Sequence, residues 1–199
     1  METVLLFGIA WMVFAVLIVI LNDKRSTLAL LALNLTIAAF LLIENDLTGA
    51  LAKATLGIVS PIIILLAIAR TKQPRRQFGV LPLIFAALLT LVLSYAVAFS
   101  VRSQFPEGRT TETYFLIALF GIAFLIIVTQ TSVVKLLLGI LILENIGTLL
   151  LAWGESTALL TIVTEVFVVL ITFTVAFIAV KDFAEYGTID SSQMTQLRG

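Results

Sequence analysis

Seven long apolar segments dominate the sequence, at residues 4–21, 26–43, 47–69, 79–101, 113–130, 133–153 and 157–180. Each is long enough to cross the hydrocarbon core of a bilayer, which takes about 20 residues in a helix. The apolar runs are continuous and do not alternate with polar residues, so we expect helices and not the strands of a membrane barrel. The connections are short and leave no room for a soluble domain. The sequence therefore predicts an all-α, polytopic integral membrane protein with about seven transmembrane helices.

The composition points to the same class of protein. Of the 199 residues, 61% are hydrophobic and 12% are charged, which is far from the composition of a water-soluble domain. The first segment follows Met1-Glu2-Thr3 and not a basic stretch, so we expect a retained helix and not a cleaved signal peptide. Cysteine and histidine are both absent, which removes the usual ligands of haem, iron–sulfur clusters and structural zinc. We expect no metal, cofactor or catalytic residue in this chain, and no nucleic-acid partner.

Basic residues are unevenly divided between the two sides of the predicted membrane span. With the N-terminus outside, the inner loops carry nine of them: Lys24, Arg25, Arg70, Lys72, Arg75, Arg76, Lys135, Lys181 and Arg198. The outer loops carry only Arg102 and Arg109. Because cytoplasmic loops are enriched in lysine and arginine, we predict an outside N-terminus and a cytoplasmic C-terminus.

Two polar loops, at residues 71–77 and 102–113, interrupt the apolar pattern. We therefore divide the chain into a four-helix N-terminal membrane segment (1–102), a three-helix segment (103–181) and a cytoplasmic tail (182–199). From Lys181 onward the sequence is polar, contains Gly187 and lacks a strong helical pattern, so we expect the tail to lie on a neighbouring subunit. No internal repeat is evident between the two halves of the sequence.

Glu144 and Glu165 are predicted to lie inside the membrane. Only Gly154-Glu155-Ser156 separates their segments, so the two helices should form a tight antiparallel hairpin. Each glutamate is about ten residues from that turn, which places both roughly 15 Å below one membrane surface. A central ionised side chain costs about 2.5–3.5 kcal/mol, and protonation relieves this cost. The pair suggests a site that handles protons or other cations; the alternative is that each carboxyl only forms a hydrogen bond across a helix interface.

Polar and small residues accompany the two glutamates. Thr161, Glu165 and Thr172 fall on one face of their predicted helix. Asn145 adjoins Glu144, and Thr148 lies one turn away. Threonine hydroxyls can hold water or bond a neighbour. We expect Gly139 and Gly147 to let another helix approach closely.

Lysines and a proline complete the set of candidate residues. Lys53 is roughly 9 Å deep in its segment, where it snorkels outward, pairs with a carboxylate or joins an ion path. Lys135 either snorkels or connects the cytoplasm to the carboxyl layer. Pro61, after Ser60, cannot donate to the Gly57 carbonyl, so it should kink its helix and leave that carbonyl to water or a cation. Asn34 is interpreted as a packing contact.

Several of these residues carry a resemblance to a known family. The stretch from Leu138 to Glu144-Asn145, the helix with Glu165, and the tail Gly187-Thr-Ile-Asp190 … Gln196-Leu-Arg-Gly199 resemble the hydrogenase-4 component E family over roughly the whole chain. Residues 113–199 are also similar to the K-type subunit of respiratory complex I and to the C-type subunit of multisubunit cation/proton antiporters. Glu165 matches the carboxylate of the last K-type helix, whereas the match of Glu144 is offset by about one helical turn.

The resemblance implies a function. It implies a membrane subunit of a group 4 NiFe hydrogenase or formate hydrogenlyase-type complex, in the cytoplasmic (inner) membrane of a prokaryote. The expected partners are antiporter-like subunits, a membrane anchor subunit and a peripheral hydrogenase arm that holds NiFe and iron–sulfur centres. Glu144 and Glu165 would belong to a path for protons or sodium ions, and the positions of Lys53 and Lys135 in their segments make them further candidates for it. The alternatives are an antiporter subunit without redox partners, a purely structural scaffold subunit and an independent small transporter; the last is disfavoured because no half-to-half repeat is evident.

Overall fold

The computed structural model describes residues 2–71, 79–101, 110–153 and 158–187, and this part of the chain is all-helical. The helices are α1 (Glu2–Ile20), α2 (Asp23–Ile43), α3 (Leu47–Ala69), α4 (Val80–Val101), α5 (Thr110–Thr129), α6 (Val133–Trp153) and α7 (Ala158–Tyr186). All seven are long and apolar enough to cross a membrane, so the chain is a multi-pass membrane protein. The predicted all-α class and the number of spans are confirmed.

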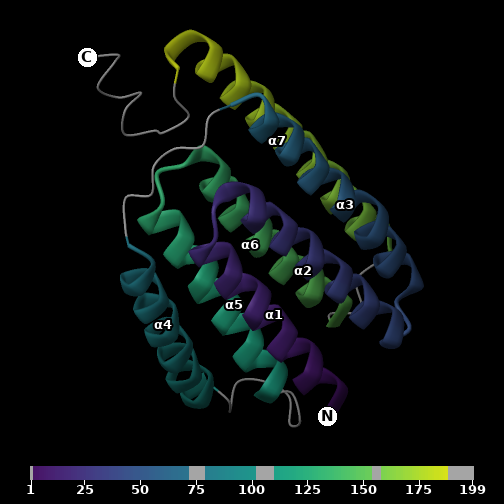
Figure 1. Ribbon diagram of the computed structural model, residues 1–199. Coiled ribbons are helices and arrows are strands. Elements are labelled where there is room, and N and C mark those ends of the chain that lie inside the picture. Colours follow the sequence, from purple (N-terminus) through teal and green to yellow (C-terminus); the bar gives the residue numbers. More distant parts are fainter. Residues whose placement is uncertain (1, 72–78, 102–109, 154–157, 188–199) are drawn as a thin grey trace.

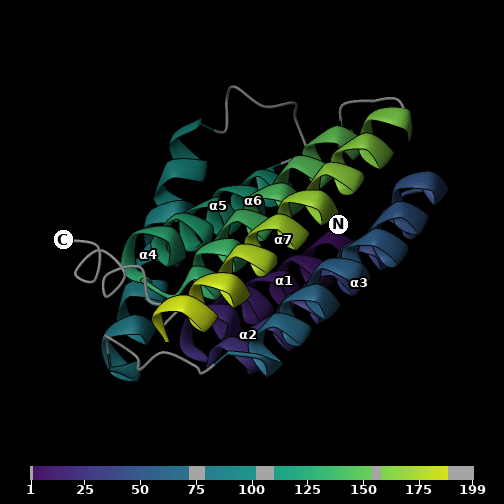
Figure 2. The same ribbon diagram turned by 90° about the horizontal axis from the view of Figure 1, so that it is seen from above.

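The helices form two layers of three. In Figure 1, α1, α2 and α3 lie in front, and α5, α6 and α7 lie behind them. Each front helix packs on one back helix: α1 on α5, α2 on α6 and α3 on α7. Figure 2 shows the two rows from above, with α4 at the edge beside α5. Successive helices run in opposite directions, and the two members of each pair are four helices apart in the chain. The paired helices therefore run in the same direction.

Local sequence explains where the helices of the first layer begin. The Asn22 side chain accepts a hydrogen bond from the backbone N–H of Arg25 and caps α2. Asp46 caps α3 in the same way by accepting from the Gly49 N–H at 2.8 Å. Between these helices Asn45 has a φ of 65°, a left-handed conformation that asparagine tolerates well. These caps allow α2 and α3 to form a close antiparallel pair.

Helix α7 is longer than the sequence predicts. The helix continues past Lys181 to Tyr186, where we expected a polar tail without helical structure. The mean hydropathy falls there, but Lys181, Glu185 and the residues between them favour helix about as well as the apolar residues do. The helix ends at Gly187, whose φ of 72° is typical of a helix C-terminus. The remainder of the predicted tail lies outside the described residues.

Two glycines of α6 have different surroundings. A Cβ at Gly139 would lie 2.9 Å from the Ile127 side chain and 3.2 Å from the Ala123 carbonyl oxygen, so α5 approaches closely there. A Cβ at Gly147 would meet no atom within 4 Å. The expected close approach therefore holds at Gly139 and is wrong at Gly147, because Gly147 lies on a part of α6 that no other described helix covers.

Candidate functional site

Lys53, Glu144 and Glu165 form a buried ionic cluster, here called the triad, where α3, α6 and α7 meet. The Lys53 Nζ lies 2.6 Å from Glu144 Oε2 and 2.9 Å from Glu165 Oε1. The Lys53 side chain is fully buried, and the glutamate side chains are only 9% (Glu144) and 1% (Glu165) exposed. The fold thus brings one cation and two carboxyl groups from distant parts of the sequence to a single point.

The directions of α3 and α7 explain why Lys53 and Glu165 meet. Lys53 lies six residues after the start of α3 at Leu47, and Glu165 lies seven residues after the start of α7 at Ala158. The two helices run in parallel, so both side chains sit about 9–10 Å from the same end of the bundle. Helix α6 runs the opposite way and presents Glu144 to the same position.

Thr148 connects the two carboxyl groups. Its Oγ1 donates a hydrogen bond to Glu144 Oε1 at 2.7 Å and lies 3.4 Å from Glu165 Oε1. A hydroxyl carries one hydrogen, so it can donate fully to only one of the two carboxyl groups at a time. A proton on either carboxyl would let that group donate in turn. The geometry therefore allows the hydrogen bonds around the triad to rearrange when its protonation changes.

The charges of the triad do not balance when both carboxyls are ionised. Two carboxylates and one ammonium leave a net charge of −1, and one added proton makes the cluster neutral. A buried net charge is costly in a low-dielectric interior, and a hydrogen-bonded cluster of zero net charge costs less. One proton is therefore the difference between a charged and a neutral triad.

The structure decides between snorkelling and pairing as interpretations of Lys53. Its ammonium pairs with both glutamates, and its side chain is fully buried and does not snorkel. The sequence left this open because Lys53 and Glu144 are 91 residues apart.

A chain of amide hydrogen bonds lies next to the triad. Asn145 Nδ2 donates to Asn34 Oδ1 at 2.9 Å, and Asn34 Nδ2 donates to the Gly57 carbonyl at 2.6 Å. Gly57 is four residues before Pro61, which has no N–H to donate. We expected water or a cation at this carbonyl; the structure instead gives it the Asn34 amide. Asn34 therefore does more than pack, because it links α2 to α3 and α6.

Three predicted hydroxyl residues lie on the faces of α3 and α7 that carry Lys53 and Glu165. Thr161 lies one turn from Glu165 toward the start of α7, and Ser60 and Thr172 lie farther along α3 and α7. All three are buried. Ser60 Oγ, Thr172 Oγ1 and Glu165 Oε2 have no hydrogen-bond partner among the described residues. The polar face predicted for α7 therefore points into the bundle.

Lys135 lies in a second polar cluster, apart from the triad. It is nine residues before Glu144 on α6, or about 13 Å away along the helix. Its Nζ donates to the Ser26 hydroxyl at 2.6 Å and to the carbonyls of Ile18 and Val19. These carbonyls belong to the last turn of α1, where a cation is favourable. The structure thus places Lys135 at a helix terminus and does not bring it to the triad.

The same end of the bundle holds a buried acid that we did not select from the sequence. Asp23, in the first turn of α2, accepts a hydrogen bond from the Ser132 hydroxyl at 2.8 Å. Both side chains are largely buried. The signal in the sequence was the pair Asn22-Asp23, which is typical of a helix start. Its contact with the start of α6 depends on the pairing of the two layers.

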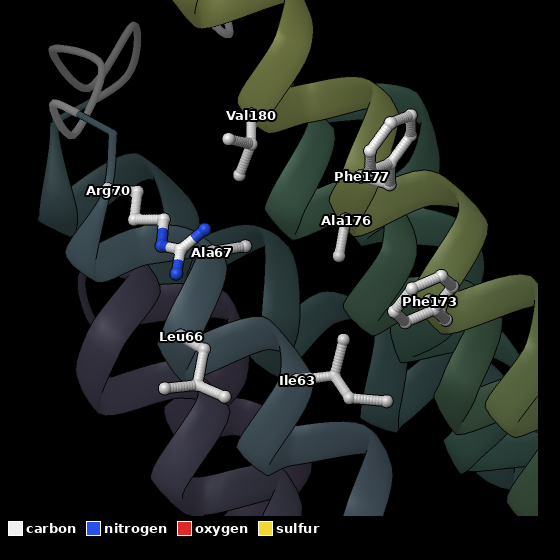
Figure 3. A pocket seen from close by; sticks show the side chains of 8 residues that line it. All are labelled: Ile63, Leu66, Ala67, Arg70, Phe173, Ala176, Phe177 and Val180. Atoms are coloured by element: carbon white, nitrogen blue, oxygen red, sulfur yellow. The ribbon is translucent and has the colours of Figure 1, made fainter.

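An apolar cleft opens between α3 and α7 at the end of the bundle where α3 terminates. Its volume is about 270 Å³, and it is lined by Ile63, Leu66, Ala67, Arg70, Phe173, Ala176, Phe177 and Val180. Figure 3 shows the Arg70 guanidinium directed toward the cleft from α3, with the two phenylalanines on α7. The cleft contains no side chain of the triad.

Comparison of the chain with protein-family models, curated proteins and solved structures gives no match. The class of protein is therefore defined by the fold and the site alone. The chain is a multi-pass helical membrane protein with a buried lysine between two glutamates.

Proposed function

We propose that the protein is a membrane subunit of a complex I-related, hydrogenase-type redox complex and helps to couple cytoplasmic electron transfer to the movement of protons or sodium ions. The observation that carries this proposal is the buried triad of Lys53, Glu144 and Glu165. Ionisable side chains in a membrane interior typically belong to ion pathways and proton relays. A scaffold subunit would be served by glutamine, which makes the same helix contacts without a charge.

The energies involved have the size that coupling requires. Moving one elementary charge against about 100 mV costs about 2.3 kcal/mol. Separating unit charges that lie about 4 Å apart costs about 4 kcal/mol at an effective dielectric constant of about 20. Opening one ion pair of the triad could therefore drive, or be driven by, the passage of a single ion. A partner subunit that shifts α3 relative to α6 or α7 would have this effect.

The family resemblance supplies the rest of the proposal. The partners are antiporter-like membrane subunits, a membrane anchor subunit and a peripheral hydrogenase arm, and the NiFe and iron–sulfur centres belong to those partners. The complex lies in the inner membrane of a prokaryote, with the N-terminus of this chain outside. Purification of the complex from native membranes, followed by assay of nickel and iron, tests this assignment. Partners without metal would favour a cation/proton antiporter, and a protein that purifies alone would favour an independent transporter.

A substitution tests the role of the triad directly. Glu165→Gln keeps the size and hydrogen-bonding capacity of the side chain but cannot release a proton. We expect ion uptake into inverted membrane vesicles to fall at least tenfold, with the complex still assembled. Glu185→Gln is the matched control, because Glu185 lies on the same helix and is exposed. If the Glu165→Gln complex assembles and moves ions at the normal rate, the scaffold function replaces the one proposed here.

A further inference from the structure

Three buried polar atoms on α3 and α7 lack hydrogen-bond partners among the described residues: Glu165 Oε2, Ser60 Oγ and Thr172 Oγ1. Leaving a buried polar atom without a partner is costly, so such atoms are commonly satisfied by water. Threonines on the outer faces of the same helices behave differently. Thr55 and Thr174 donate to the carbonyls of Leu51 and Leu170, four residues earlier. The two interior hydroxyls are thus left available to another molecule.

Ser60 and Thr172 lie at the same level of the bundle. Ser60 comes seven residues after Lys53 on α3, and Thr172 comes seven residues after Glu165 on α7. Seven residues are almost two turns, so each hydroxyl faces the same way as its triad residue, about 10 Å farther along the helix. Since α3 and α7 run in parallel and pack together, both hydroxyls enter one interface. Their level is displaced from the triad toward the end of the bundle that carries Arg70.

We propose that Ser60 and Thr172 form a water-binding layer that extends the ion path from Glu165 toward this end of the bundle. This inference rests on the function proposed above. The ligand is water, and the species transferred is a proton. The Glu165 carboxyl releases its proton to a water molecule, each water passes one proton on as it accepts another, and the carboxylate left behind remains paired with Lys53. The two hydroxyls hold the water in place and form no covalent bond.

An apolar layer closes the path beyond the hydroxyls. There, Ile64, Leu137 and Ala176 surround a cavity of about 10 Å³ between α3, α6 and α7. A space of this size holds about one water molecule and offers it no polar partner, so it should be dry. Apolar side chains thus separate the water layer from the end of the bundle. This barrier would prevent protons from leaking when the complex is idle.

The test removes both interior hydroxyls by substitution and compares proton uptake with that of a control in which two exposed hydroxyls are removed. In the intact complex, Ser60→Ala with Thr172→Val should lower proton uptake into inverted vesicles at least tenfold. Thr55→Val with Thr174→Val removes two hydroxyls from the exposed faces of the same helices and should leave uptake unchanged. The exchange Ser60→Thr with Thr172→Ser keeps both hydroxyls and should retain most of the activity.

The outcomes separate this inference from the proposed function. Normal uptake in the Ser60→Ala, Thr172→Val complex, together with loss of uptake in Glu165→Gln, would overturn the water layer but leave the triad in its role. Normal uptake in both would overturn both. If the double variant does not assemble, a density map of the unmodified complex, at a resolution that shows ordered water, tests the proposal instead. Water bonded to Ser60 Oγ and Thr172 Oγ1 supports the layer, and a dry interface at these atoms contradicts it.

Discussion

At the scale of single residues, Lys53 is expected to stabilise the fold as well as the site. Lys53→Met would leave two buried carboxyl groups close together without their cation. Removing one partner of a buried ionic cluster typically costs about 3–5 kcal/mol. We therefore expect a clear fall in the melting temperature of the detergent-purified protein. The triple variant Lys53→Met, Glu144→Gln, Glu165→Gln removes all the charges together and should recover most of the loss.

An exposed lysine provides the control for this prediction. Lys24 lies in the first turn of α2 and its side chain is exposed, so Lys24→Met should leave the melting temperature almost unchanged. Equal stability of Lys53→Met and the triple variant would show that the ammonium does not offset the two carboxyl charges.

The sequence identified the triad residues but not their arrangement. Glu144 and Glu165 stand out because carboxyl groups are rare in apolar segments, and their distances from the turn between them place both at similar depth. The partner of the two acids depends on which helix packs on α7. The sequence around Lys53 does not indicate which helix packs on α7. The alternatives of snorkelling and pairing could therefore be separated only by the packing of α3 on α7.

At the scale of the helices, Pro61 inside α3 and the amide of Asn34 should act as one unit. Asn34→Ala leaves the Gly57 carbonyl without a donor and should destabilise the protein by about 1–3 kcal/mol. With Pro61→Ala, residue 61 regains an N–H that can reach this carbonyl. The cost of Asn34→Ala should then be smaller. The Asn145 amide loses its acceptor in both backgrounds, so a double-mutant cycle isolates the Gly57 bond. An equal cost in both backgrounds would show that the two residues act independently.

The two glycines of α6 provide a second prediction at this scale. Gly139→Ala forces a methyl group against Ile127 and the Ala123 carbonyl, and overpacking of this kind typically costs about 1–3 kcal/mol. Gly147→Ala meets open space, and alanine favours helix over glycine by about 1 kcal/mol. Thermal unfolding in detergent should therefore show a lower melting temperature for Gly139→Ala and an unchanged or higher one for Gly147→Ala. The reverse order would mean that α5 does not pack against α6 at Gly139.

Helix positions were predictable from the sequence, whereas helix neighbours were not. The predicted spans agree with the observed helices to within a few residues, except at the extended end of α7. Hydropathy locates each span because the bilayer sets its length. It does not identify the facing helix, since lipid tails and leucine side chains are equally apolar. The sequence favoured a tight pair of α6 and α7, yet α7 packs more extensively on α3 than on α6.

At the scale of the whole molecule, the stacking of the two layers explains how the polar groups meet. The division into residues 1–102 and 103–181 separates Lys53 from both glutamates, and the layers bring them together. The hydrogen bond between Asn34 and Asn145 joins residues 111 apart, and nearly the same separation relates Lys53 to Glu165. Two three-helix sets, α1–α3 and α5–α7, stacked helix on helix produce this regularity.

The distribution of charge over the whole molecule predicts its orientation in the membrane. Among the described residues, every lysine and arginine except Lys53 lies at the end of the bundle where α1, α3, α5 and α7 terminate: Lys24, Arg25, Arg70, Lys135 and Lys181. Positive residues are retained on the cytoplasmic side, so this end should face the cytoplasm. The chain has no native cysteine, so single cysteines can report on each side. A membrane-impermeant maleimide should label Glu44→Cys in intact cells and Lys24→Cys only after permeabilisation. The opposite labelling would show that the molecule is inserted the other way round. The water layer of Ser60 and Thr172 would then lie on the external side of the triad and not on its cytoplasmic side.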